Sequence, residues 1–160
     1  MNMNQTNLQA VLEMLRNGTG LRTHSGTVAP GDVFVALSGT RVDGARFIDD
    51  ALARGARVVV HGRGVDASRR EGVSFLEVDS PAQTLGLLAR AACQTESRLP
   101  RIIGVTGTNG KTTTAHLIHS LLSGNSMAAG LIGTVRCSWP GVDVPATMTT
   151  PDCLSLHEII

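Results

Sequence analysis

The sequence has few aromatic residues and few cysteines, and it has no long apolar run. Three Phe, one Trp and no Tyr provide too little aromatic surface for nucleobase stacking to be a main binding device. Cys93, Cys137 and Cys153 are odd in number and lack C-x-x-C spacing, which argues against a disulfide framework or a zinc site. No stretch approaches the length of a membrane span, and the polar residues 1–7 do not resemble an export signal. These absences predict a soluble protein of the reducing cytoplasm.

The sequence also lacks an excess of charge of either sign. Its formal net charge is +1, and acidic and basic residues are interspersed. This balance argues against a basic stripe for nucleic acid and against a polybasic patch for a membrane surface. We therefore expect neither as a partner, and any anionic ligand must be held by local groups.

The first part of the chain alternates between helical and strand-like patterns. Apolar residues at helical spacing predict helices, and short β-branched runs bounded by turn residues predict strands. Ser80-Pro81 offers a cap followed by proline at the first helical position. The expected ranges are 8–15, 47–52 and 80–93 for helices, and 33–37, 57–60 and 73–78 for strands. This order indicates β-α-β units with right-handed crossovers.

The polar residues 94–100, which include a proline, are the best candidate for a domain boundary. We expect one domain over residues 1–98 and the beginning of another over 99–160. In the second, the pattern predicts strands at 102–105 and 128–135 on either side of a helix at 111–122. Pro140-Gly141 predicts a turn, and residues 150–152 predict the start of a last helix. The expected fold class is α/β, with a small α/β domain followed by the start of a truncated parallel-sheet domain.

Residues 102–114 combine an apolar run, a glycine-rich turn and a Lys-Thr pair that opens a helix. In such a loop the backbone N–H groups point inward, and the helix N terminus adds about half a positive charge. Lys111 would neutralise the β- and γ-phosphates of ATP, and the Thr112 hydroxyl would bind a Mg²⁺ ion. The alternative is a glycine-rich turn that binds no ligand.

The loop departs from the general phosphate-loop motif at one position. The motif G-x-x-x-x-G-K-[ST] requires glycine where Val105 stands. The match is therefore to the variant G-x-x-G-K-T-T, in the required context of a preceding strand and a following helix. The expected ATP-binding residues are Gly107, Thr108, Asn109, Gly110, Lys111, Thr112, Thr113 and Thr114.

The segment at residues 106–114, T-G-T-N-G-K-T-T-T, closely resembles the nucleotide loop of the Mur ligases, which assemble the peptide of bacterial cell-wall precursors. Residues 23–36 are similar to that family's uridine-site signature D-S-R-x-V-x-x-G-D-x-F-V-A, with departures at His24 and Gly26. Residues 148–152 resemble the T-T-P-[DE] element of the branch that adds the third residue of the peptide. The three motifs occur in the family's order, and the resemblance covers all 160 residues.

The resemblance implies a set of substrate contacts and a reaction. Family members transfer the γ-phosphate of ATP to a substrate carboxylate, and an amine then displaces phosphate to form an amide. The implied substrates are UDP-N-acetylmuramoyl-L-alanyl-D-glutamate and diaminopimelate, with lysine as the alternative amino acid, and Lys111 is the implied catalytic residue. The implied uridine-diphosphate contacts are Thr23, Ser25, Thr40, Arg41 and Val42, and the implied muramoyl-peptide contacts are Thr149 and Thr150.

The resemblance also implies parts of the machinery that do not occur before Ile160. These are an acidic metal ligand, a modified lysine that holds a second metal, and a domain that binds the amino acid. We therefore expect the 160 residues alone to be inactive as a ligase. The alternative function is that of a truncated, non-catalytic fragment that binds a nucleotide or a UDP-sugar.

The histidines offer a competing site. His116 and His119, three positions apart on the predicted helix, could reach one metal ion, but no third ligand is evident. We expect both to face solvent. His61 and His157 are expected to be ordinary surface residues.

Overall fold

The computed structural model describes residues 3–39, 43–65, 72–97, 99–146 and 150–160. Contacts divide the chain into two compact units, Met1–Leu99 together with Cys153–Ile160, and Pro100–Asp152. This grouping places the end of the chain with the first unit, whereas the sequence pattern assigned residues 99–160 to one domain. No helix in the described part of the chain is long and apolar enough to cross a membrane.

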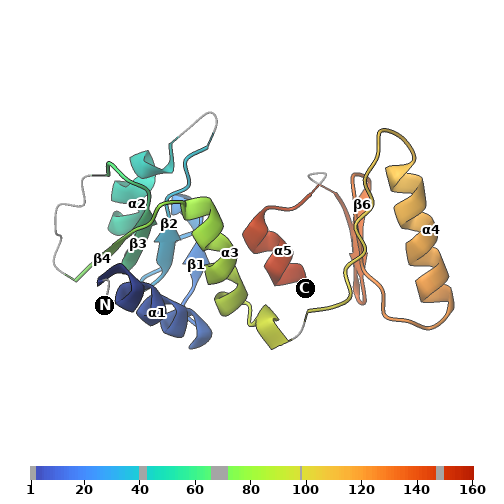
Figure 1. Cartoon of the computed structure of the whole chain (residues 1–160), viewed down its shortest axis with the longest axis horizontal. Helices are drawn as coiled ribbons and strands as arrows, with labels where there is room; N and C mark the ends of the chain where they lie inside the picture. Colours follow the sequence, from blue (N-terminus) through green and yellow to red (C-terminus); the bar gives the residue numbers. More distant parts are fainter. Residues whose placement is uncertain (1–2, 40–42, 66–71, 98, 147–149) are drawn as a thin grey trace. The chain divides into compact units, whose positions relative to one another are not determined.

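The first unit is built on a four-stranded parallel sheet (Figure 1). The strands are β1 (Leu21–Arg22), β2 (Val33–Val35), β3 (Val58–His61) and β4 (Ser74–Glu77), and their order in the sheet is the order in the chain. The helices are α1 (Met3–Arg16), α2 (Ile48–Ala53), α3 (Pro81–Ala92) and α5 (Cys153–Ile159), with short 3-10 turns η1 (Ser25–Thr27), η2 (Gly44–Phe47) and η3 (Thr95–Ser97). The α/β class with a parallel sheet is thereby confirmed.

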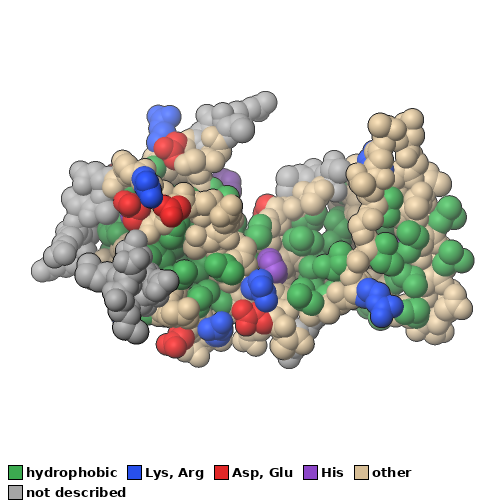
Figure 2. All heavy atoms as spheres, viewed as in Figure 1, with side chains coloured by type: hydrophobic (Ala, Val, Ile, Leu, Met, Phe, Trp, Pro, Cys, Tyr) green, Lys and Arg blue, Asp and Glu red, His purple; other side chains and the backbone are tan. Residues whose placement is uncertain are grey.

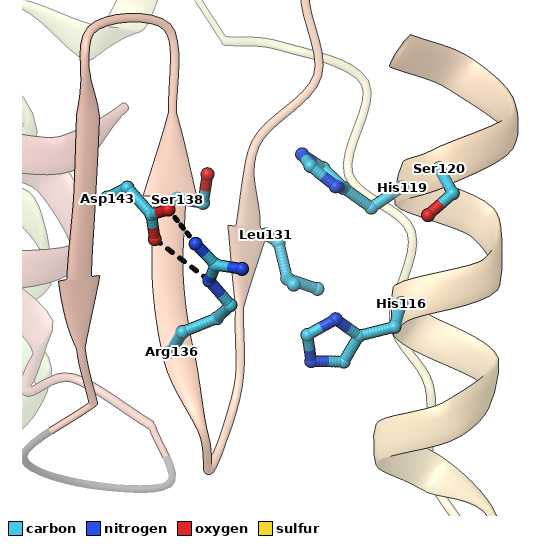
Figure 3. Close-up of a pocket in the computed structure, with 7 residues that line it drawn as sticks. All are labelled: His116, His119, Ser120, Leu131, Arg136, Ser138 and Asp143. Carbon is cyan, nitrogen blue, oxygen red and sulfur yellow. Dashed lines mark hydrogen bonds and ion pairs between the residues drawn. The ribbon is translucent and has the colours of Figure 1, made fainter. Parts of the chain in front are cut away.

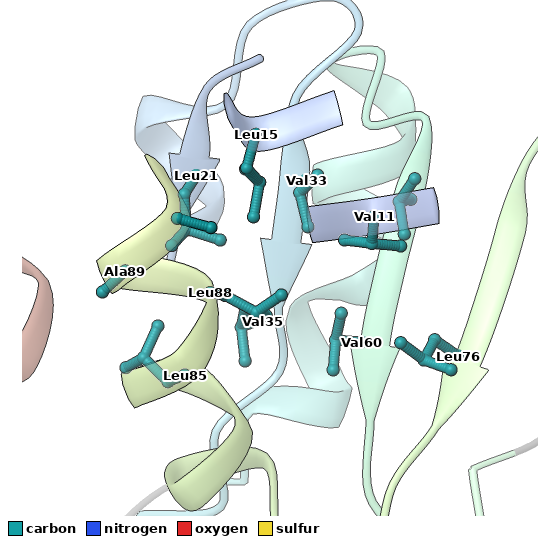
Figure 4. Packing of buried hydrophobic residues seen from close by; sticks show 12 residues of the cluster. Val11, Leu15, Leu21, Val33, Val35, Val60, Leu76, Leu85, Leu88 and Ala89 are labelled. Carbon is teal, nitrogen blue, oxygen red and sulfur yellow. The ribbon is translucent and has the colours of Figure 1, made fainter. Parts of the chain in front are cut away.

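Both faces of this sheet are buried, because alternate strand residues point to opposite sides. Val33 and Val35 of β2 join a core with α1 and α3, and Phe34 between them joins a second core with α2. Figure 4 shows Leu15 of α1 near Val33 and Leu88 of α3 beside Val35. Each of these leucines is fully buried, which contributes about 1.5–3 kcal/mol per side chain. The sheet is therefore a rigid base for the loops at its ends.

The start of α3 follows the predicted cap. Ser80 Oγ accepts a hydrogen bond from Gln83 N at 3.4 Å, and Pro81 is the first helical residue. The last helix, α5, belongs to the first unit because Cys153 and Leu154 pack against its core. Its placement depends on these apolar contacts, which the local pattern at residues 150–152 does not contain.

The second unit consists of α4 (Lys111–Gly124) and an antiparallel sheet of β5 (Leu131–Ile132), β6 (Arg136–Trp139) and β7 (Val142–Pro145). The predicted helix is confirmed. The predicted turn is also present, because Trp139 pairs with Val142 across Pro140-Gly141. Gly141 has φ +85°, a left-handed conformation that favours glycine in tight hairpins. Figure 2 shows apolar side chains on the surface of α4, where Leu117 and Leu121 are exposed.

One strand prediction in this unit was wrong, and another was only partly confirmed. Residues 102–105 form no strand, and Ile102 is 68% exposed. Only residues 131–132 of the predicted strand at 128–135 are extended in a sheet, and their pairing is antiparallel. A strand needs a neighbouring strand for its backbone hydrogen bonds. β5 finds this neighbour in β6, which lies close in the sequence, so the entropy cost of closing the loop is small. No described strand pairs with residues 102–105, so their apolar pattern alone did not produce a strand.

Candidate functional site

The predicted phosphate loop leads directly into α4. Gly110 caps the helix with φ +76°, and Gly107 has φ +151°, so both glycines adopt backbone conformations that other residues rarely take. The first helical hydrogen bond runs from Thr114 N to Gly110 O at 2.9 Å. The loop and the start of the helix are exposed. The unpaired N–H groups of the first turn and the helix dipole therefore face a space that an anion can enter.

Lys111 folds back over this loop. Its Nζ donates hydrogen bonds to Gly107 O at 2.7 Å and to Thr108 O at 3.3 Å. The ammonium group thus lies beside the backbone that would surround a phosphate. The contacts of the Lys111 side chain lie within the loop, at the carbonyls of Gly107 and Thr108, and Gly110 ends the loop. A phosphate site requires this arrangement.

Thr112, the second residue of α4, has a contact that sequence reasoning missed. Its Oγ1 lies 3.1 Å from Oγ1 of Thr134, which stands between β5 and β6. No sequence motif links these residues across 22 positions. Mg²⁺ prefers oxygen ligands, keeps several waters and takes few ligands from the protein besides substrate phosphates. One hydroxyl beside a phosphate loop fits that chemistry.

A small pocket of about 310 Å³ lies between α4 and the antiparallel sheet (Figure 3). Arg136 spans its sheet side and forms a two-pronged ion pair with Asp143, with Nε–Oδ1 at 2.8 Å and a second contact between Nη2 and Oδ2. The expectation that His116 and His119 face solvent was wrong, because both are half-buried and line this pocket. In the described part of the chain, no three His, Cys, Asp or Glu residues are grouped to hold a metal.

In the first unit, the predicted uridine-site residues follow parallel strands. Thr23 comes directly after β1, and the predicted contacts at 40–42 come after β2 in the sequence. Carboxyl ends of parallel strands meet at one edge of a sheet, where open α/β proteins commonly bind ligands. Thr40, Arg41, Val42 and Thr149 lie outside the described residues, whereas Thr150 is described and exposed.

The residues that flank 40–42 are held together. Ser38 Oγ donates to Asp43 Oδ1 at 3.3 Å, and the same oxygen accepts from Ala45 N at 3.1 Å. A Cβ on Gly44 would lie 2.4 Å from Leu37 O, so only glycine permits this close approach. Asp43 therefore caps the turn that begins at Gly44.

Ser25 is already engaged within the protein. It is 7% exposed, and its hydroxyl forms a hydrogen bond with Asp50 of α2. This bond, with a smaller contribution from the nearby Arg54, holds the pKa of Asp50 below its ordinary value of 3.8. His24 precedes η1 without a side-chain cap, at a position where the family signature has Asp. A ligand contact by the Ser25 hydroxyl would compete with Asp50.

Removing the Ser25 hydroxyl should raise the pKa of Asp50 toward 3.8. A carboxyl with a lowered folded-state pKa adds stability above its unfolded pKa and loses it as the pH falls through the folded value. Ser25→Ala should therefore reduce the acid dependence of stability in that interval. Carboxyl NMR titration measures the shift, and Arg54→Gln is the control, with a smaller rise expected. An unchanged Asp50 titration in Ser25→Ala would contradict this assignment.

Asp32 organises the loop between β1 and β2, although the sequence analysis assigned it no role. It is 6% exposed, and its Oδ2 accepts from Arg22 Nε and from Ala29 N, both at 3.0 Å. A Cβ on Gly20 would lie 2.2 Å from Oδ1, so glycine is needed beside the carboxylate. Asp32 matches the acidic residue of the G-D pair in the family's uridine-site signature. This match was the only feature of the sequence that pointed to a role for Asp32. By fixing both ends of the loop, Asp32 positions Thr23 and Ser25.

The surface assignment of two histidines was wrong. His61 is 1% exposed and lies edge-on to Phe75, and its Nδ1 is 2.8 Å from Gly62 O. Its Nε2 has no hydrogen-bond partner among the described residues. His157 lies on α5, with Nδ1 2.9 Å from Oγ1 of the buried Thr95. Both positions depend on tertiary packing, because His61 continues a buried strand and α5 packs on α3.

Two family models match the chain. The model described as "Mur ligase family, catalytic domain" matches residues 18–92, and the model described as "Mur ligase middle domain" matches residues 105–160. The first match includes β1 to β4 with the loops that follow them, and the second begins just before the phosphate loop. The two models together therefore match both candidate sites.

Two curated ligases are similar to the chain in sequence. The UDP-N-acetylmuramoyl-L-alanyl-D-glutamate–2,6-diaminopimelate ligase of Lawsonia intracellularis is 43% identical over 139 residues, which cover 83% of the chain and 27% of the relative. The ligase of the same name from Gloeobacter violaceus is 42% identical over 144 residues, which cover 88% of the chain and 28% of the relative. The chain thus spans less than a third of the length of these relatives.

Two solved structures support the same fold. A structure of a UDP-N-acetylmuramoyl-L-alanyl-D-glutamate–2,6-diaminopimelate ligase has a TM-score of 0.66 and 30% identity, covering 86% of the chain and 28% of the solved chain. MurF ligase from Thermotoga maritima in complex with ADP has a TM-score of 0.59 and 32% identity, covering 89% and 29%. The latter structure contains bound ADP.

Proposed function

This chain belongs to the Mur ligase family, and from that membership we propose that it is part of an ATP-dependent amide ligase of peptidoglycan synthesis. The reaction that we propose joins diaminopimelate to UDP-N-acetylmuramoyl-L-alanyl-D-glutamate. The names of the similar proteins support diaminopimelate over lysine as the added amino acid. The cytoplasm, which holds ATP, is the proposed compartment.

The observation that carries the proposal is the phosphate loop at the start of α4. Gly107 and Gly110 leave room for phosphate, and Lys111 lies over the loop with its ammonium group hydrogen-bonded to loop carbonyls. On ATP binding, Lys111 would exchange these carbonyls for the β- and γ-phosphate oxygens. Thr112 would hold Mg²⁺, which supplies further neutralisation of the phosphate charge.

The proposed chemistry is a transfer followed by a displacement. A carboxylate oxygen of the glutamyl group attacks the γ-phosphorus, the bond to the bridging oxygen breaks, and ADP leaves. The amine of diaminopimelate then attacks the acyl carbon, phosphate leaves, and the amine loses a proton as the amide forms. Negative charge spreads over the transferred phosphoryl group in the first step, and Lys111 would stabilise it there.

We assign the nucleotide-sugar substrate to the carboxyl edge of the parallel sheet. Thr23 lies at that edge, and Ser25 follows in the loop that Asp32 fixes. The family resemblance adds Thr40, Arg41 and Val42 to this site, and its T-T-P-[DE] element assigns the muramoyl-peptide to Thr149 and Thr150. We accordingly propose that residues 1–98 bind the UDP-sugar and that residues 99–160 begin the ATP-binding domain. The two family matches, over 18–92 and 105–160, support this division.

The 160-residue chain should bind Mg²⁺-ATP without turning it over. The phosphate loop is contained in the chain, whereas the resemblance places other catalytic groups beyond residue 160. Calorimetric titration with ATP tests binding, and a phosphate-release assay with ATP, UDP-N-acetylmuramoyl-L-alanyl-D-glutamate and diaminopimelate tests turnover. Absence of ATP binding by folded chain would refute the nucleotide site, and substrate-dependent phosphate release would refute the expected inactivity.

Ligase function is tested in a chimera. In it, the chain replaces the matching segment of the Gloeobacter violaceus relative, of which it spans 28%. The chimera should form the amide product when given all three substrates. A folded chimera that binds ATP but makes no product, beside an active parent ligase, would instead favour a non-catalytic binding fragment.

A further inference from the structure

A hydroxyl pair joins the first turn of α4 to the link between β5 and β6. Oγ1 of Thr112 and Oγ1 of Thr134 are 3.1 Å apart, and each can donate or accept a hydrogen bond. We propose that Thr134 is a positioning residue that orients the Thr112 hydroxyl for the divalent cation accompanying ATP. This inference rests on the proposed function, because it assigns a role within the nucleotide site.

The fold brings Thr134 to this place through the packing of β5 on α4. Leu131 of β5 is buried and pairs with Ser138, and Ile132 pairs with Cys137. Ala146 N donates to Val135 O at 3.2 Å, which ties the link between β5 and β6 to the residue after β7. Thr134 lies in that link, so the sheet determines where its hydroxyl stands.

The contact matters because threonine in a helix has two accessible side-chain rotamers. The observed one places Oγ1 3.1 Å from Oγ1 of Thr134, and the other would turn it away. A bond to Thr134 favours the observed orientation. When a Thr112 lone pair faces a cation, the hydroxyl proton needs an acceptor, and Oγ1 of Thr134 is within reach. Thr134 would thus determine the side-chain rotamer of Thr112 and accept its hydroxyl proton, which leaves a lone pair of Thr112 Oγ1 for the cation.

The first test uses the ligand-free chain. Three-bond coupling constants measured by NMR report the χ1 angle of Thr112. The parent should show one dominant rotamer, and Thr134→Val, which keeps the shape but removes the hydroxyl, should show averaging between two. Thr134→Ser should retain the parent value. An unchanged χ1 distribution in Thr134→Val would overturn the proposal.

The second test measures ATP affinity with Mg²⁺ and with EDTA. Outer-shell partners of metal ligands typically change metal affinity by about 10–100-fold, so Thr134→Val should weaken Mg²⁺-ATP binding by about 10-fold and leave binding in EDTA unchanged. Thr134→Ser should restore the parent affinity. Ser138→Ala, which removes a hydroxyl from the adjacent strand β6, is the matched control and should behave as the parent.

The outcomes separate this proposal from the proposed function. If the parent binds Mg²⁺-ATP and Thr134→Val binds it equally well, the role of Thr134 is refuted and the nucleotide site stands. Equal weakening with Mg²⁺ and with EDTA would mean a general disturbance of the loop, and would also refute the positioning role. If the folded parent binds no ATP in either condition, both proposals fail.

Discussion

Replacing Lys111 with alanine should lower the affinity for Mg²⁺-ATP by about 100-fold. Lys111 Nζ reaches two loop carbonyls, and with ATP bound it would make two charge-assisted bonds to phosphate oxygens instead. Hydrogen bonds to charged groups contribute about 1.5–3 kcal/mol each, and about 3 kcal/mol in total corresponds to about 100-fold in affinity. In the chimera the same change should abolish amide formation, because the transferred phosphoryl group loses its cation.

The measurement is an ATP titration of parent and variant with circular dichroism as a check of folding. Arg101→Ala is the matched control, because it removes an exposed cation close to the loop in the chain; an exposed charge that contacts no ligand should change affinity little. Lys111 is also the only lysine of the chain, so acylation followed by peptide mapping reports on it directly. ATP should protect Lys111 from the reagent. Equal affinity in the variant, or no protection, would refute its role.

Replacing Asp32 with alanine should lower the free energy of unfolding by about 2–4 kcal/mol. The change leaves the Ala29 N–H and the Arg22 guanidinium without their buried acceptor. An unsatisfied buried donor costs about 1–3 kcal/mol, and breaking a buried ion pair costs about 3–5 kcal/mol. The expected total is below the sum because Arg22 is partly exposed and Ala29 is exposed, so water can replace part of both lost contacts. The loop that carries Thr23 and Ser25 should also become more mobile, because Asp32 no longer holds Arg22 and Ala29.

Urea unfolding followed by circular dichroism measures this loss. Asp79→Ala is the matched control, because Asp79 pairs with Arg63 at 2.6 Å while both side chains are exposed, and such pairs contribute about 0–1 kcal/mol. Gly20→Ala tests the same carboxylate from its other side, since the new Cβ would collide with Oδ1. Equal losses in Asp32→Ala and Asp79→Ala would contradict the assigned role of Asp32.

Local patterns predicted the elements that are stabilised by their own residues. The Ser80-Pro81 cap predicted the start of α3, and Pro140-Gly141 predicted the hairpin turn between β6 and β7. The glycines and Lys111 predicted a loop that leads into a helix, and the structure shows that loop with Gly110 in a left-handed conformation. Each of these features depends on bonds within a few residues, so the local order of residue types was sufficient.

The sequence by itself determined the α/β class, the parallel strands β2, β3 and β4 of the first unit, the glycine-rich turn that leads into α4 and the family that its motifs resemble. Only the tertiary structure decided that His61 is buried, that Ser25 holds Asp50, that Thr134 meets Thr112 and that residues 102–105 remain unpaired. A periodic pattern indicates which residues are apolar and face a core. It does not indicate which distant residues pack against them or form hydrogen bonds with them. Burial, strand pairing and side-chain contacts join residues far apart in the chain, and only the folded arrangement selects those partners.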